Sequence, residues 1–161
     1  MWHYFGPPAV FKTMSPDEQD NMRVKLYAIT GEHKIPTTKD MMDEEMCFLD
    51  LTLRKKVRSK FPGACAIEFQ NIMDIVTKVL IGWDKQKAEG SNGVYGIPLA
   101  YGAGVEEQAR KSLHAHFCVW IKYFNLWCDL LFDDDRERQI LARTELTKIF
   151  SNDCISYTRR H

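Results

Sequence analysis

The sequence has no long apolar run and no excess of charge of either sign, and both absences limit its function. The longest strongly apolar stretch, 115–120, is far shorter than the roughly 18 residues that a membrane-spanning helix needs. The N-terminus has no basic segment followed by an apolar one, so we expect no secretory signal. Lys plus Arg and Asp plus Glu each number 22, so no global basic field indicates nucleic-acid binding. We expect an intracellular protein without a membrane partner, in which any nucleic-acid binding depends on a local patch.

Paired cysteines and a phosphate-binding loop are also absent. The five cysteines are an odd number and none are spaced as Cys-x-x-Cys, which argues against a disulfide framework and a zinc finger. No Gly-x-x-x-x-Gly-Lys-Ser/Thr sequence occurs, so we expect no nucleotide cofactor. The composition, 45% apolar and 27% charged, is that of a globular protein. We expect residues 1–161 to form a single domain.

Hydrophobic periodicity predicts an α+β fold with an antiparallel sheet covered by helices. Strands are expected over 9–14, 99–108 and 112–121, and residues 109–111 form a hairpin turn between the last two. Helices are expected over about 15–29, 40–60 and 64–82, and after the acidic run 133–135, which we interpret as a helix cap. The expected core stripe of the helix over 64–82 is Ile67, Ile72, Val76, Val79 and Leu80. Residues 85–96 are expected to form an exposed loop.

The strand expected over 112–121 carries the candidate chemistry. Alternation places His114 and His116 on one face together with Cys118, while the odd-numbered residues form an apolar face. Two imidazoles at positions i and i+2 of a rigid strand lie close enough to share one metal ion. The pair therefore predicts a metal site, for which a neighbouring strand must supply a third ligand.

The preceding strand offers three polar side chains for that role. A three-residue turn would pair Glu106 with His114 and would place Glu106 and Gln108 on the histidine face. A turn one residue shorter or longer would bring Glu107 to that face instead, because a one-residue slip inverts every side chain. The sequence alone does not decide between these two registers of the hairpin.

Basic and aromatic residues near this hairpin are candidates for nucleic-acid contacts. Phosphates could be bound by side chains at the turn and beyond the strand, namely Arg110, Lys111 and Lys122. Unpaired bases could stack on Trp120, Phe124 and Trp127, although the spacing of these aromatics fits core packing better.

Residues 105–120 resemble the second motif of Helitron transposon replication initiators, which are histidine-hydrophobic-histidine endonucleases. The family pattern is Glu-x-Gln-Gly-Arg-Gly, two residues, His-hydrophobic-His and an apolar run that ends in Trp. From position 106 this chain has Glu-Glu-Gln-Ala-Arg-Lys-Ser-Leu-His-Ala-His, followed by Phe-Cys-Val-Trp. The segment 6–13, which ends in Phe-Lys-Thr, is similar to the first motif, and 62–83 is similar to the corresponding helix. The resemblance covers most of the chain.

The resemblance implies a ferredoxin-like or palm fold and a single-stranded DNA nicking and strand-transfer activity. His114 and His116, with Glu106 and Gln108, would bind Mg or Mn, which polarises the scissile phosphate for attack by a tyrosine. It also implies a nuclear location in a eukaryotic host.

Two departures from the family pattern affect this expectation. Ala109 and Lys111 replace the two glycines of the turn. The family's nucleophilic tyrosines lie on a downstream helix, whereas the only late tyrosine here is Tyr157, which has no partner at that spacing. We therefore expect a fragment that lacks its nucleophile, and whether it is an enzyme is left open. The alternative is a non-catalytic, transposon-derived remnant that binds nucleic acid or a protein partner.

Overall fold

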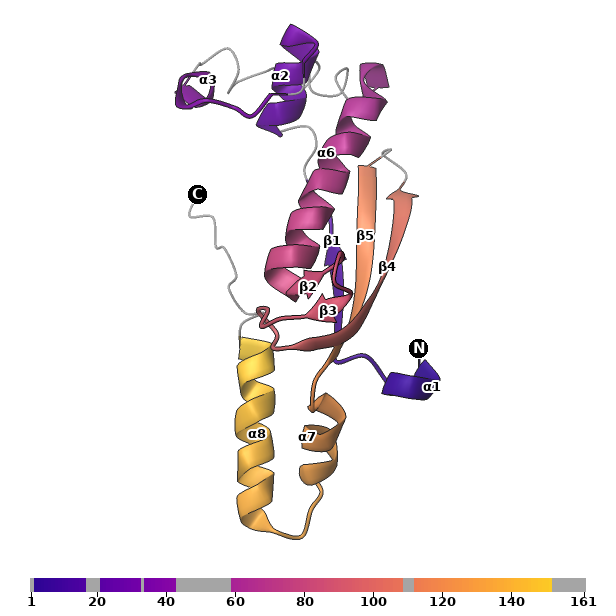
Figure 1. Ribbon diagram of the computed structural model, residues 1–161, viewed down its shortest axis with the longest axis vertical. Helices are drawn as coiled ribbons and strands as arrows, with labels where there is room; N and C mark the ends of the chain where they lie inside the picture. The colour runs from indigo at the N-terminus through magenta and orange to yellow at the C-terminus, as the bar shows by residue number, and fades with distance from the viewer. Residues whose placement is uncertain (1, 17–20, 33, 43–58, 109–111, 152–161) are drawn as a thin grey trace. The chain divides into compact units, whose positions relative to one another are not determined.

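The computed structural model describes the chain except for residues 1, 17–20, 33, 43–58, 109–111 and 152–161. Helices and antiparallel strands are mixed, which confirms the predicted α+β class. The described elements are, in chain order, α1 (Trp2–Phe5), β1 (Val10–Met14), α2 (Met22–Thr30), α3 (Thr38–Met42), α6 (Pro62–Ile75), η1 (Val76–Ile81), β2 (Trp83–Asp84), β3 (Glu89–Gly90), β4 (Pro98–Gln108), β5 (Ser112–Ile121), α7 (Phe124–Leu130) and α8 (Arg136–Ser151) (Figure 1). No helix in these described ranges is long and apolar enough to cross a membrane.

A three-stranded sheet in the order β1-β5-β4 contains all three predicted strands (Figure 1). Their bounds differ from the predicted ones by at most one residue. The predicted alternation in β5 is confirmed between His114 and Val119, where odd-numbered residues are buried and even-numbered residues are half-buried. The histidine strand is therefore the central strand of the sheet. The predicted turn at 109–111 lies outside the described residues.

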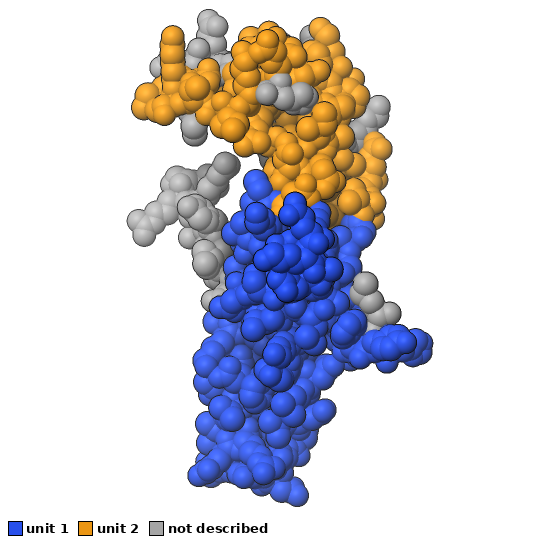
Figure 2. All heavy atoms as spheres, in the orientation of Figure 1, with its two compact units in different colours: residues 1–13, 75–104, 116–161 blue, residues 14–74, 105–115 orange. Residues whose placement is uncertain are grey.

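The chain divides into two compact units, which Figure 2 shows in blue and orange. Unit 1 comprises Met1–Thr13, Ile75–Gly104 and His116–His161, and unit 2 comprises Met14–Asp74 and Val105–Ala115. Both β4 and β5 contribute residues to each unit, and His114 and His116 belong to different units. The single domain over 1–161 stays a prediction.

In unit 2, the packing of α2 against α6 forms a small core. Val24 and Cys65 are both buried, and Ala28 and Phe61 pack against them. The helix α2 begins later than predicted, because the Asn21 side chain caps it by accepting a hydrogen bond from the backbone N–H of the residue after Met22. The predicted helix over 40–60 is represented by α3 at its start, and 43–58 lie outside the described residues.

A buried carboxylate also joins these two helices. Glu68 of α6 lies 3.6 Å from Arg23 of α2 and accepts hydrogen bonds from the amides of Asn21 and Asn71. Burying a charge is costly unless it is paired and hydrogen-bonded, and Glu68 has both kinds of partner. We interpret this polar cluster as structural.

The helix predicted over 64–82 is present, but its buried face was predicted only in part. Val76 is buried and Ile72 is half-buried, whereas Ile67, Val79 and Leu80 are 49%, 62% and 40% exposed. The buried side chains are instead Ala64, Cys65, Glu68, Phe69, Met73, Val76, Thr77 and Ile81. The cause at the C-terminal end is the π-helical segment η1, in which i→i+5 hydrogen bonds widen each turn and shift the buried stripe.

The segment predicted as an exposed loop over 85–96 contains the strand β3, which pairs with β2 in a small antiparallel hairpin. The Asp84 carboxylate accepts hydrogen bonds from the backbone N–H groups of Lys87 and Gln86, which hold the pKa of this carboxyl below its usual value and close the turn. After β3, the backbone at Gly93 passes close to η1, since a Cβ there would lie 2.3 Å from the carbonyl oxygen of Ile81. Only glycine fits this approach.

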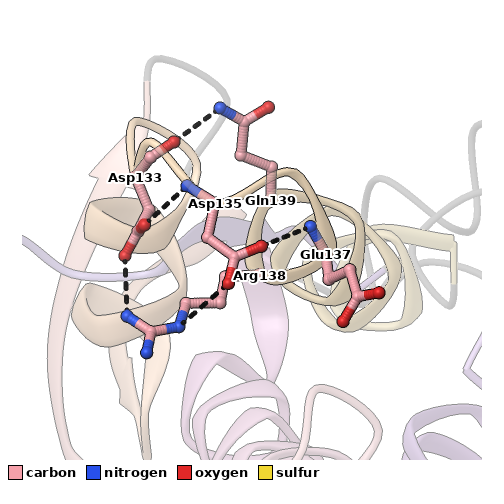
Figure 3. A network of polar contacts seen from close by, with 5 residues as sticks. All are labelled: Asp133, Asp135, Glu137, Arg138 and Gln139. Atoms are coloured by element: carbon pink, nitrogen blue, oxygen red, sulfur yellow. Dashed lines mark hydrogen bonds and ion pairs between the residues drawn. The ribbon is translucent and has the colours of Figure 1, made fainter.

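The two last helices, α7 and α8, lie side by side in unit 1 (Figure 1). The acidic run before α8 acts as predicted: Asp135 accepts a hydrogen bond from the N–H of Glu137, and Asp133 accepts one from the N–H of Asp135 (Figure 3). Asp133 also pairs with Arg138. Capping of α8 is therefore confirmed. On α8, Leu146 and Ile149 are buried, whereas Ile140, Leu141 and Phe150 are about half exposed.

Candidate metal-binding strand

Each of the two candidate histidines has a hydroxyl partner on the edge strand β1 or just after it. In unit 1, Thr13 Oγ1 lies 3.0 Å from His116 Nδ1. In unit 2, Ser15 Oγ lies 2.5 Å from His114 Nδ1. The same nitrogen is engaged in both rings, although the two pairs are about a hundred residues apart in sequence. Sequence reasoning missed both hydroxyls; the one available signal was the Thr that ends the Phe-x-Thr motif.

These contacts bear on which ring nitrogen can bind a ligand. When Nδ1 carries the proton and donates a hydrogen bond to a hydroxyl oxygen, Nε2 keeps a lone pair and can act as the ligand atom. Metal-binding histidines commonly have such a partner on the second nitrogen, which fixes the tautomer and the ring orientation. In His114 the Nε2 atom also lies 3.2 Å from Ser112 Oγ, so an ion at that nitrogen would have to displace the Ser112 hydroxyl.

An aromatic ring completes the environment of His116 in unit 1. The Phe11 ring lies nearly parallel to the imidazole, with 5.9 Å between ring centroids and 13° between planes. Phe11 is 66% exposed, although it comes from a strand of the sheet. The imidazole is thus held by a hydroxyl at its edge and by a ring against its face.

The remaining predicted ligands are only partly described. Glu106 and Glu107 are exposed residues of β4. The side chain of Gln108, the turn residues Arg110 and Lys111, and Tyr157 lie outside the described residues. Within the described part of the chain, no three or more His, Cys, Asp or Glu side chains form a group suited to hold a metal ion. A divalent ion at the two histidines stays a prediction, and the described residues define no third ligand.

The predicted aromatic candidates for base stacking have different environments. Trp120 is buried and its indole N–H donates to the carbonyl of Gly6 at 2.8 Å, so it is a core residue. Phe124 packs edge-to-face against Phe150 of α8. Trp127 is half-buried and lines a cavity. Phe124 is also half-buried and lines a second pocket, so both Phe124 and Trp127 combine partial exposure with a hollow surface.

Comparison with known proteins gives no match. No protein-family model matches the chain, no curated protein is significantly similar to it, and no solved structure matches it. The likeness to Helitron initiators consequently stays a prediction that rests on the motif residues.

Proposed function

We propose that the chain is the metal-binding part of a single-stranded DNA nicking and strand-transfer domain of the Helitron type. One observation carries the proposal. Two histidines at positions i and i+2 of a central strand each have Nδ1 engaged by a hydroxyl, at Thr13 and at Ser15. With the proton on Nδ1 in both rings, this arrangement would leave the Nε2 atoms for a divalent ion, here Mg or Mn, once the Ser112 hydroxyl moves away from His114 Nε2.

Glu106 is the third ligand that we favour. The interval between Gln108, which ends β4, and Ser112, which begins β5, is the three residues 109–111. A hairpin with that interval supports a register in which Glu106 faces His114, with Gln108 as the next candidate on the same face. Glu107 would replace them if the register slipped by one residue.

In this proposal the protein's own residues position the reactants. A divalent ion bound by the histidines would supply Lewis-acid polarisation of the scissile phosphate. Thr13 and Ser15 hold the imidazoles, while Arg110, Lys111 and Lys122 contact other phosphates. Tyr157 is the candidate nucleophile to test. A palm or ferredoxin-like arrangement and a nuclear location in a eukaryotic host belong to the same proposal.

The test is cleavage of labelled single-stranded DNA in Mn²⁺. A nick, or a covalent protein–DNA adduct, that forms with the wild-type chain and is lost in His114→Ala and in His116→Ala would support the proposal. Tyr157→Phe tests whether Tyr157 forms such an adduct, and His3→Ala is the matched control because this exposed histidine lies outside the strand. Cleavage that persists in both strand variants would contradict the proposal.

The same experiment separates the alternative function. DNA that is bound but neither cut nor attached to the protein, with or without Mn²⁺, would contradict nicking. That result would support a non-catalytic, transposon-derived remnant that binds nucleic acid.

A further inference from the structure

A cavity of about 370 Å³ lies wholly within unit 1, between the loop 92–97, the end of β5 and the helices α7 and α8. Its volume is in the range of small-molecule pockets. None of the proposed metal ligands lines it. The residues that give it chemical character are Tyr95, Lys122, Tyr123, Trp127, Glu145 and Lys148.

Aromatic side chains form part of the wall. Tyr123 is 55% exposed and meets the half-buried Trp127 edge-to-face, with 6.4 Å between ring centroids. Tyr123 has a left-handed backbone conformation with a φ of 67°, which is rare for a residue with a large side chain. An exposed ring held in a strained conformation at a cavity is suited to stack on a flat ligand.

The cavity has an excess of one positive charge. Lys148 pairs with Glu145, whereas no ion pair joins Lys122 to a carboxylate of the described residues. The two lysines minus one glutamate leave a net charge of +1. The Lys122 ammonium lies 4.9 Å from the centroid of the Tyr123 ring, so the two side chains form a cation–π contact.

The loop backbone cannot easily supply further anion contacts. The N–H groups of Gly93 and Gly96 each donate to the other residue's carbonyl, and the N–H of Val94 donates to Leu80. The charged donors to an anionic group in the cavity are therefore its lysine side chains. Lys122, beside the aromatic pair, is the one with no carboxylate partner among the described residues.

We propose that this cavity binds a nucleobase joined to a phosphate, as one unpaired nucleotide of a single strand presents them. The base would stack on the exposed Tyr123 ring beside Trp127, and the phosphate would contact Lys122. The inference deepens the proposed function, in which Lys122 already contacts a phosphate: it places that contact in a cavity beside a stacked base, and it needs neither a metal nor the histidines.

The test is the affinity of the full chain for a short labelled oligothymidylate, measured by fluorescence anisotropy in EDTA so that no metal contributes. Lys122→Gln should weaken binding and reduce the slope of log affinity against log salt by about 0.7, the value for one lost phosphate contact on a single strand. Lys87→Gln is the matched control, because Lys87 is an exposed lysine of unit 1 outside the cavity. An unchanged slope in Lys122→Gln would overturn the phosphate contact.

A second variant tests the stacking contact without straining the fold. Tyr123→Asn removes the ring, and asparagine accepts the left-handed backbone conformation better than tyrosine does. We expect affinity to fall on the order of tenfold. Tyr4→Asn, at a 90% exposed tyrosine outside this cavity, should have no effect. Equal affinities of Tyr123→Asn and wild type would overturn the inference.

A further arm identifies the source of the nucleotide. If thymidine monophosphate competes as well as the oligonucleotide, the ligand is a free nucleotide. If it does not, the ligand is part of a strand. Because these affinities are measured in EDTA, failure of the metal proposal would not affect this result.

Discussion

The contacts of Thr13 and Ser15 change the interpretation of the histidine strand more than those of any other residues. The sequence shows two histidines at strand spacing, but it cannot show which ring nitrogen faces a ligand. That property depends on hydroxyls that lie about a hundred residues earlier in the chain. Local patterns carry no information on such distant partners, so this part of the candidate site was beyond prediction.

Removal of the Thr13 hydroxyl tests this orienting role. Thr13→Val keeps the β-branched shape of the strand residue but leaves His116 Nδ1 without its hydroxyl partner. We expect Mn²⁺ affinity, measured by electron paramagnetic resonance, to fall by about 10- to 100-fold. Thr147→Val is the control, since that hydroxyl donates only within α8. Equal affinities of the Thr13 variant and wild type would contradict the orienting role.

Asp133 links the stability of the α7–α8 hairpin to pH. The N–H of Asp135 and then Arg138 hold the pKa of the Asp133 carboxyl below its usual value. A lowered pKa in the folded state stabilises the protein above the unfolded-state pKa, and this contribution is lost as pH falls through the folded value.

Asp133→Asn should therefore lower stability at pH 7 and reduce the further loss on acidification below about pH 3.8. Urea unfolding of both proteins at pH 7 and pH 3 measures the difference. Asp134→Asn, at the adjacent exposed acid, is the control. Equal losses of stability between pH 7 and pH 3 in Asp133→Asn and wild type would contradict the role of Asp133 in this pH dependence.

At the scale of elements, local patterns predicted the strands better than the faces of the helices. Alternation and the composition of the hairpin located β4 and β5 closely, because period-two burial is a property of the strand itself. The C-terminal part of the stripe on the helix over 64–82 was misplaced, since a π-helical end changes the periodicity on which the prediction depends. The short strands β2 and β3 contain too few residues for any alternation to appear.

The close passage of the loop 92–97 past η1 is an element-scale feature that mutation can test. Gly93→Ala would place a Cβ 2.3 Å from the carbonyl oxygen of Ile81, so the loop must move. We expect a loss of roughly 1–3 kcal/mol in the free energy of unfolding. Gly63→Ala is the matched control, because a Cβ there meets nothing within 4 Å and should be neutral or stabilising. Equal stabilities of the two variants, measured by urea unfolding, would contradict the close approach.

At the scale of the whole molecule, the α+β class follows from the sequence, whereas the completed site does not. One of the four boundaries between the two units falls inside β5, between Ala115 and His116, and no local pattern marks it. The third ligand depends on the register across 109–111, which one residue of slip would invert. Long-range pairing and register are decided by the entire chain, so sequence alone leaves Glu106 and Glu107 as alternatives.

Urea unfolding of the full chain with and without Mn²⁺ tests the metal site on β5 most directly. At a Mn²⁺ concentration 100-fold above the dissociation constant, we expect the free energy of unfolding to rise by about 2.7 kcal/mol in wild type and in His3→Ala. We expect no such metal-dependent shift in the double variant His114→Ala, His116→Ala. A shift of equal size in the double variant, or none in wild type, would contradict a metal site on this strand.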